Sequence, residues 1–250
     1  MQAKIKEFAE LIKKSQRIVF FGGAGVSTES GVKDYRSEDG LYNTVKEYGV
    51  PPEEILSHSF FVKHTDVFYD FYRKYFIADD VQPNKAHKSL YELEKMGKLS
   101  GIITQNIDGL HQKAGSEKIF ELHGTTSKYY CTKCRKFYAL PEVRDDIIKG
   151  VPKCTCGGII KPDVVLYEEQ LNEDTIWRAI GAIGDADLLI IGGTSLTVQP
   201  AASFISYFHG KNIVLINKGE TFMDRKATIV FKDKIGDVLS AALNEVRNEN

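Results

Sequence analysis

Arg17-Ile-Val-Phe-Phe-Gly-Gly-Ala-Gly-Val-Ser-Thr28 is the most informative stretch near the start of this 250-residue chain. It begins as a short apolar run and ends in glycines, as a buried parallel strand does where it enters a tight turn. Such glycines let the backbone approach a pyrophosphate, and N–H groups at a following helix start face its charge. A turn with a purely structural role is the competing interpretation. Thr28 replaces the third glycine of G-x-G-x-x-G, which argues against an ordinary hydride-transfer domain.

Similar apolar runs recur along the chain, and helical patterns separate them. The runs are Gly101-Ile-Ile-Thr-Gln, Asp187-Leu-Leu-Ile-Ile-Gly-Gly and Asn212-Ile-Val-Leu-Ile-Asn, with weaker candidates at 119–122 and 228–231. The helical patterns lie at 1–16, 84–96, 174–183 and 235–246. Alternating strands and helices predict an α/β fold with a parallel sheet and helices on both faces.

Two segments interrupt this alternation. Residues 127–165 are polar and contain all four cysteines, so they predict a small module inserted into the α/β domain. Residues 37–76 are rich in aromatic residues and poor in strand signals, so they predict short helices. We expect most of these aromatic rings to form a core.

The composition is that of a globular protein. Hydrophobic residues make up 42% and charged residues 27%, and the formal net charge is -1, which lacks the electrostatic pattern of a nucleic-acid binder. Apolar runs such as 188–191 are far shorter than the about 20 residues that span a bilayer. The N-terminus is charged throughout, unlike a signal peptide. We therefore expect a cytoplasmic protein that binds neither membranes nor nucleic acid directly, while its oligomeric state is not indicated.

The four cysteines form two close pairs. Two residues separate Cys131 from Cys134, and one residue separates Cys154 from Cys156 after a 19-residue gap. Four thiolates so arranged suit a tetrahedral zinc ion, and because they leave no position for water, such a zinc is structural. The alternatives are an iron–sulfur cluster and disulfides, which a cytoplasmic location disfavours.

Polar residues follow the second apolar run. Gln105, Asn106 and Asp108 stand where a buried strand is expected to end, which is where parallel α/β folds bind ligands. Capping of a helix by Asn106 or Asp108 is the alternative. His123 stands at another expected strand end beside a glycine, and is a candidate general base, although a lone histidine more commonly has a structural role.

Two further strand ends repeat this pattern. Thr194 and Ser195 follow the run that begins at 187, and Asn217 and Lys218 follow the run that begins at 212. Three polar strand ends along one crevice indicate a dinucleotide ligand.

Taken in order, these segments resemble the sirtuin family, in its bacterial type, from about residue 5 to residue 246. The resemblance rests on Gly23-Ala-Gly-Val-Ser27 with Ser30-Gly-Val-Lys-Asp-Tyr-Arg36, on Gln105-Asn-Ile-Asp108, on Leu122-His-Gly124, on the four cysteines, and on Gly193-Thr-Ser195. Connecting segments such as Pro83-Asn-Lys-Ala-His87 and Lys161-Pro-Asp-Val-Val-Leu-Tyr-Glu168 also resemble the family.

The resemblance implies a Rossmann-type NAD-binding domain and a smaller zinc-ribbon domain, with NAD and an acyl-lysine peptide between them. Residues 1–36, 77–126 and 166–250 would form the NAD-binding domain, and 127–165 the zinc-ribbon module. Residues 37–76 would be a helical, aromatic-rich insertion that belongs to the small domain.

Individual residue roles are also implied by the resemblance. Contacts to NAD would come from Ala24, Thr28, Tyr35, Arg36, Gln105, Asn106, Ile107, Asp108, Thr194, Ser195, Asn217, Lys218 and Ile235. The first four would hold the diphosphate and the reacting sugar, those at 105–108 would receive the ribose and nicotinamide, and the last five would hold the ADP half. A peptide substrate would pair as an added strand with Val165, Leu166, Tyr167 and Glu168.

The activity implied by the resemblance is NAD-dependent lysine deacetylation. The acetyl group would pass from lysine to ADP-ribose, which releases nicotinamide and O-acetyl-ADP-ribose. His123 would accept a proton from the ribose hydroxyls, and Asn106 would be the second catalytic residue.

Two departures from the family pattern are visible. Lys33 and Tyr35 stand where proline and phenylalanine are usual, and Tyr75 follows Tyr72 in place of the Tyr-x-x-Arg pair that accompanies acidic-acyl removal. We therefore expect neutral acyl groups, acetyl first, with longer chains as an alternative. Mono-ADP-ribosyl transfer is the other enzymatic alternative. An NAD sensor without turnover and a zinc-ribbon nucleic-acid binder are the non-enzymatic ones.

Overall fold

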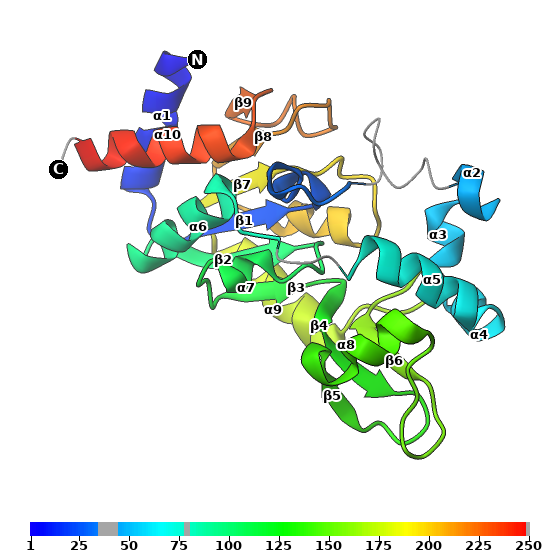
Figure 1. Ribbon diagram of the computed structural model, residues 1–250. Coiled ribbons are helices and arrows are strands. Elements are labelled where there is room, and N and C mark those ends of the chain that lie inside the picture. The colour runs from blue at the N-terminus through cyan, green and yellow to red at the C-terminus, as the bar shows by residue number, and fades with distance from the viewer. Residues whose placement is uncertain (35–44, 78–80, 249–250) are drawn as a thin grey trace.

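The computed structural model describes residues 1–34, 45–77 and 81–248, and its larger sheet is parallel throughout (Figure 1). The strand order is β3-β2-β1-β7-β8-β9. These strands are β1 (Ile18–Gly22), β2 (Leu99–Thr104), β3 (Ile119–Glu121), β7 (Leu188–Gly192), β8 (Asn212–Ile216) and β9 (Ile229–Phe231). A sheet that grows outward in both directions from its first strand is the Rossmann-type arrangement, so the predicted fold class is confirmed.

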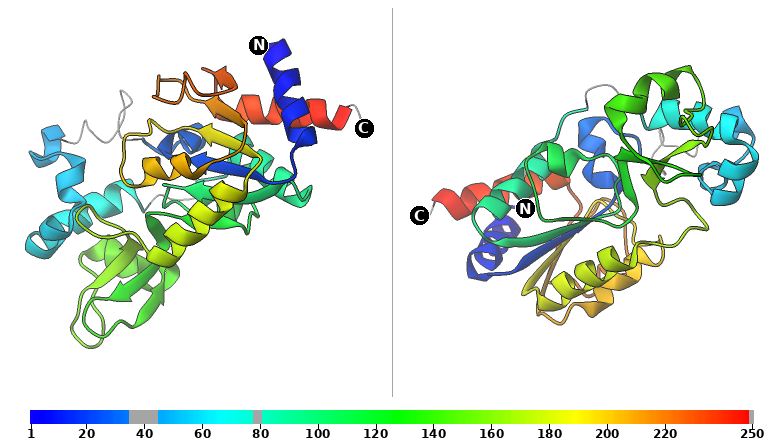
Figure 2. Two further views of the ribbon diagram at one scale, coloured as in Figure 1. Left: turned by 180° about the vertical axis from the view of Figure 1, so that it is seen from behind. Right: turned by 90° about the horizontal axis from the view of Figure 1, so that it is seen from below.

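Helices cover both faces of this sheet (Figure 2). One face carries α1 (Gln2–Lys14), α6 (Lys85–Lys95) and α10 (Ile235–Asn248), and the other carries α9 (Glu173–Asp185) and η4 (Ala201–Tyr207). Neighbouring residues of β1 serve opposite faces, since Phe20 packs in the first apolar layer and Phe21 in the second. Within the described ranges, no helix has the length and apolar character to cross a membrane.

The helical patterns in the sequence correspond to real helices with clear starts. Asn84 caps α6 by accepting from the N–H of Ala86, and Asn172 caps α9 by accepting from the N–H of Thr175. The predicted patterns at 1–16, 84–96, 174–183 and 235–246 match α1, α6, α9 and α10 to within a few residues. Two short 3₁₀ turns, η1 (Ala24–Val26) and η2 (Thr28–Ser30), and the short helix α7 (Leu110–Lys113) follow β1 and β2.

The second sheet is small and antiparallel, in the order β5-β4-β6. It contains β4 (Gly124–Cys131), β5 (Phe137–Ala139) and β6 (Ile160–Val164), and α8 (Leu140–Lys149) lies beside it. The helices α2 (Val45–Tyr48), α3 (Pro52–Ile55), α4 (His58–Lys63) and α5 (Thr65–Tyr75) gather near it (Figure 1).

A third apolar cluster joins the small sheet to α5. The hydroxyls of Tyr72 in α5 and Tyr129 in β4 lie 3.0 Å apart, and the hydroxyl of Tyr69 donates to the carbonyl of Ile160. Phe68 and Tyr72 stack with ring centroids 5.7 Å apart. The aromatic residues of the 37–76 segment that the structure describes thus form a core, as expected.

The chain enters and leaves the small sheet through one narrow place. His123 precedes β4, Val165 follows β6, and the N–H of Val165 donates to the carbonyl of His123 at 2.9 Å. Gly124 has a φ of 76°, and a Cβ at this position would overlap the carbonyl of Asp163. Only glycine fits this crossing, because both the positive φ and the close approach exclude a side chain.

Candidate active site and metal centre

The turns that follow β1 and β7 lie against each other at the carboxyl edge of the parallel sheet. The N–H of Gly25 donates to the carbonyl of Gly193 at 2.8 Å, and the N–H of Gly23 donates to that of Gly192 at 3.3 Å. A Cβ on Gly25 would lie 2.8 Å from the Cα of Gly193. The glycines therefore have a packing role between the two turns, as the structural interpretation of the motif requires, and this contact brings two predicted cofactor-binding segments together.

Ser27 connects two of the predicted site residues. Its hydroxyl donates to Oδ2 of Asp108 at 2.6 Å and accepts from Nδ2 of Asn106 at 3.0 Å. Asp108 also accepts from the N–H of Leu110 at 2.9 Å, although the N-cap residue of α7 is Gly109 and not Asp108. Burial raises the pKa of Asp108, and the hydrogen bonds from Ser27 and the backbone oppose that rise.

His123 is held by one ring nitrogen. Its Nδ1 lies 3.0 Å from the carbonyl oxygen of Gln105. Because a carbonyl can only accept, Nδ1 carries the proton, and Nε2 keeps its lone pair. Burial lowers the pKa of His123, against a smaller opposing effect of the Gln105 contact, so the ring is neutral near pH 7. This is the protonation state that a general base requires.

Gln105 links this group to the end of β7. Its Nε2 donates to Oγ1 of Thr194 at 3.2 Å, while its carbonyl holds His123. Thr194 is buried and also accepts from the N–H of Leu196 at 3.2 Å. The structure therefore joins five of the predicted site residues, Gln105, Asn106, Asp108, His123 and Thr194, by direct contacts or through Ser27.

The remaining predicted cofactor residues lie around this group. Ala24 is half-buried in η1, and the hydroxyl of the exposed Thr28 donates to the carbonyl of Gly25 at 3.0 Å. The carbonyl of Ile107 accepts from both the N–H and the hydroxyl of Thr126, each at 2.9 Å. Tyr35 and Arg36 lie outside the described residues.

The predicted residues that follow β7 and β8, together with Ile235, differ in burial. Ile235 is buried, and a Cβ on Gly192 would overlap it, so Ile235 covers the end of β7. Asn217 donates to the carbonyl of Gly219 at 3.0 Å, whereas Lys218 is exposed. Ser195 is also exposed, with its hydroxyl 2.9 Å from that of Thr197.

The segment predicted to pair with a peptide contains a turn. The N–H of Glu169 donates to the carbonyl of Leu166 at 3.0 Å, and Glu168 has a φ of 75°. The N–H of Tyr167 donates to Leu56, and its carbonyl accepts from His58, both at 2.9 Å. Much of this backbone is already hydrogen-bonded within the chain, including the N–H of Val165, which donates to the carbonyl of His123.

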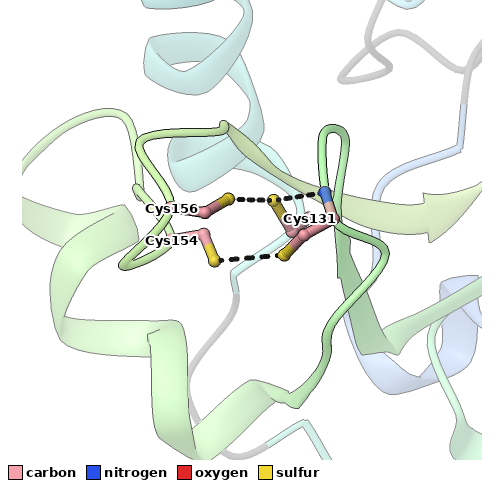
Figure 3. Close-up of side chains that lie close together, drawn as sticks. Cys131, Cys154 and Cys156 are labelled. Atoms are coloured by element: carbon pink, nitrogen blue, oxygen red, sulfur yellow. Dashed lines mark hydrogen bonds between the residues drawn. The ribbon is translucent and has the colours of Figure 1, made fainter.

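The four cysteines converge on one point (Figure 3). Their sulfur atoms all lie within 4.8 Å of one another, with 3.4 Å between Cys131 and Cys156 and 3.6 Å between Cys134 and Cys154. Four sulfurs bound to one zinc ion at about 2.3 Å are about 3.8 Å apart, so the spacing fits this metal. The N–H groups of Lys133 and Cys134 point to the Cys131 sulfur at 3.4 Å, as suits a thiolate.

Sequence reasoning missed Ser27. Its side chain is fully buried and bridges two candidate site residues that lie about 80 positions away. One signal was available in the sequence: Ser27 follows the apolar Val26, so its hydroxyl was a candidate for burial. A buried hydroxyl needs a hydrogen-bond partner. That partner could not be named without knowing that β1 and β2 are neighbours.

Comparisons with known proteins agree with this geometry. Residues 23–200 match the family model described as the Sir2 family. An "NAD-dependent protein deacetylase" from Clostridium tetani is 54% identical over 242 residues, which cover 96% of this chain and 98% of the relative. A second protein of the same description, from Clostridium perfringens, is 54% identical over 246 residues and covers 98% of this chain and 100% of its own length.

A solved structure described as "Sir2-p53 peptide-NAD+" has a similar fold. It superposes with a TM-score of 0.86 at 36% identity and covers 96% of this chain and 98% of the solved chain. The likeness spans both sheets, so it includes the cysteine module as well as the parallel sheet.

Proposed function

This chain belongs to the Sir2 family, and we propose that it removes acetyl groups from protein lysines with His123 as the general base. It is an NAD-dependent protein deacetylase, with NAD as co-substrate and zinc as a structural ion. The observation that carries the residue assignment is the contact between Nδ1 of His123 and the Gln105 carbonyl, which leaves Nε2 able to accept a proton.

The polar group around Ser27 suits the nicotinamide end of NAD. A carboxamide offers both a donor and an acceptor, and Asp108 and Asn106 supply the complementary acceptor and donor. Their mutual contacts through Ser27 fix both side chains before any ligand arrives. When bound, NAD supplies a ribose that accepts the acetyl group as nicotinamide leaves.

His123 would act after the acyl oxygen has engaged the sugar. Its Nε2 would take a proton from a ribose hydroxyl and so make that oxygen a better nucleophile. The Gln105 carbonyl stabilises the imidazolium that forms, because it already accepts from Nδ1. Gln105 would hold the neighbouring ribose, and the residues after β7 and β8, with Thr194 among them, would hold the ADP half.

The substrate is proposed to be a protein lysine that carries a neutral acyl group. We expect the peptide to pair as an added strand with residues 165–168, at the boundary between the two sheets. Acetyl is the first choice, and longer neutral chains are the second. A solved Sir2 structure with a propionylated peptide is similar to this chain, with a TM-score of 0.85 and 35% identity.

We also propose the division into domains given by the resemblance. Residues 127–165 and the helical segment 37–76 would form one small zinc-containing domain, and 1–36, 77–126 and 166–250 the NAD-binding domain. The shared apolar cluster between α5 and β4 supports this grouping. Because the four thiols require reducing conditions, the cytoplasm is the proposed location.

The test is an acetyl-lysine peptide assay followed by mass spectrometry, with and without NAD. We expect equal amounts of nicotinamide and O-acetyl-ADP-ribose from the wild-type chain. His123→Ala should lower kcat by about 10²–10⁴-fold, the usual effect of losing a general base. His209→Ala, at an exposed histidine, is the matched control and should have wild-type turnover.

Two outcomes would contradict this proposal. Wild-type turnover in His123→Ala would remove His123 as the base. A peptide that keeps its acetyl group while ADP-ribose becomes attached to protein would favour mono-ADP-ribosyl transfer instead.

A further inference from the structure

The side chain of Asn84 binds the turn after β1. The residue precedes α6, and its Nδ2 donates to the carbonyl of Val26 at 2.8 Å and to the hydroxyl of Ser30 at 3.0 Å. Its Oδ1 accepts from the N–H of Ala86 at 2.8 Å. The Asn84 side chain thus joins the first turn of α6 to the segment that carries η1 and η2.

The position of Asn84 is itself fixed by the protein core. Nδ1 of His87 accepts from the N–H of Asn84 at 3.3 Å, which completes a reciprocal cap at the start of α6. His87 is fully buried, and its ring lies 4.7 Å from the ring of His111 in α7, between centroids. The ring of His111 lies 6.3 Å from that of Phe20 in β1. The anchor therefore rests on packed elements and not on an exposed loop.

Glu29 secures the far end of the same segment. Its Oε1 accepts from the N–H of Gly236, at the start of α10, at 3.1 Å. A Cβ on Gly236 would lie 2.8 Å from Oε2 of Glu29 and 3.0 Å from the Cβ of Lys85. The starts of α6 and α10 thus both contact segment 26–30, which leaves its opposite side to Ser27 and the residues after β2.

We propose that Asn84 is a positioning residue for NAD, which keeps the turn at 24–30 in its binding conformation before the co-substrate arrives. The inference rests on the proposed function, because it takes this turn as part of the NAD site. A turn that is already ordered loses little conformational entropy on binding, whereas a loosened turn must first be ordered, which weakens affinity.

The variants Asn84→Asp and Asn84→Ser separate positioning from capping. Aspartate and serine cap helices about as well as asparagine, so both variants keep the start of α6. Neither can replace the Nδ2 contacts, because a carboxylate cannot donate and a serine hydroxyl is too short to reach Val26 and Ser30. Asn172→Asp is the matched control, since Asn172 caps α9 on the other face of the sheet.

Both Asn84 variants should bind NAD about tenfold more weakly, as the loss of two hydrogen bonds predicts. The KM for NAD should rise by a similar factor, while the KM for the peptide and kcat stay close to wild type. The melting temperature should fall by a few degrees, because two part-buried hydrogen bonds are lost while the helix cap is kept. Asn172→Asp should bind NAD as the wild type does. Calorimetry of NAD binding and steady-state kinetics provide these readouts.

An unchanged Kd for NAD in both Asn84 variants would overturn the proposal. A loss confined to Asn84→Asp would assign the effect to charge and overturn it equally. If either variant fails to fold, Ser30→Ala keeps the cap and removes one contact, so its Kd should rise about threefold, and an unchanged value contradicts the proposal. A wild-type chain that binds NAD without deacetylating would contradict the proposed function alone, because the Kd comparison would still hold.

Discussion

The zinc site and the cofactor site of this protein are assembled in opposite ways. The four cysteines come from two short segments, 131–134 and 154–156, within one small module. The proposed cofactor site gathers side chains from four separate strand ends, from Ser27 to Thr194. A site built from neighbouring residues is visible in sequence spacing, whereas one built from strand ends depends on the order of strands in the sheet.

The two sites also differ in what holds them. A structural zinc binds its thiolates with an apparent free energy of about 10–16 kcal/mol, in a single metal centre. The cofactor site is held by many hydrogen bonds, each with a net contribution of about 1 kcal/mol. Loss of one zinc ligand should therefore unfold the whole zinc module. Loss of one hydrogen bond should weaken the cofactor site by only a small step.

Loss of zinc is the largest effect we expect. Cys131→Ser should abolish stoichiometric zinc binding and unfold the module of β4, β5, β6 and α8, because that module has one metal centre. Zinc content by mass spectrometry and hydrogen exchange across 124–164 would measure it. Thr155→Ser, between two ligands, is the control. Full zinc content and wild-type hydrogen-exchange protection in Cys131→Ser would contradict the claim that the zinc module depends on its single metal centre.

The second-largest effect we expect is a loss of stability on acidification, caused by the two buried histidines beneath the cofactor site. Burial lowers the pKa of His87 to about 4 and that of His111 to about 3, with a smaller contribution to His111 from His87. Their unfolded pKa is near 6.5, so the unfolded chain binds protons that the folded chain does not, and stability falls as pH drops below about 6.5. Each histidine contributes about 1.4 kcal/mol per pH unit in that range.

The slope of unfolding free energy between pH 6.5 and 5 tests this expectation. Carboxylates whose pKa is lowered, such as Asp224 at about 2, contribute little there. The raised pKa of the buried Asp108 opposes the fall in stability, and the lowered pKa of His123 adds to it, so the comparison with a variant is needed. His111→Leu should reduce the slope, because it removes one buried titrating ring and keeps an apolar side chain of comparable size. His209→Leu should leave the slope unchanged. Identical slopes in wild type and His111→Leu would refute the assignment.

Ser27→Ala should have the smallest effect. It leaves Asp108 and Asn106 each without one partner, which should lower the unfolding free energy by about 1–2 kcal/mol. Urea unfolding would measure the change, with Ser240→Ala in α10 as the control. Because the lost bond lowers the pKa of Asp108, that pKa should rise further in the variant. A loss of unfolding free energy as large as that in Cys131→Ser would contradict the claim that the cofactor site is stabilised by many small contributions.

Most of the fold was predictable because its strands are buried on both faces. Runs such as 188–191 are uniformly apolar, and glycines or polar residues end them, so strand positions follow from composition alone. The helices α6 and α9 are marked by asparagine caps and apolar periodicity. The cysteine cluster was predictable from spacing.

The rest of the candidate site was not predictable, because it depends on contacts between distant segments. The bridge from Ser27 to Asn106 and Asp108 requires β1 and β2 to be neighbours in register. The contact between His87 and His111 requires α6 and α7 to pack on the same face. The turn at 166–169 was missed because Glu168, which adopts a positive φ, gave no glycine signal.

The crossing at His123 and Val165 has a consequence for how such proteins diversify. The whole zinc module is inserted through these two adjacent residues, which are tied by one backbone hydrogen bond. An insertion whose two ends lie side by side can be lengthened, shortened or exchanged in evolution without moving the parallel strands, provided that its packing against α5 is kept. Since the proposed base stands at this crossing, any such exchange would alter which protein surfaces reach His123 while its chemistry stays the same.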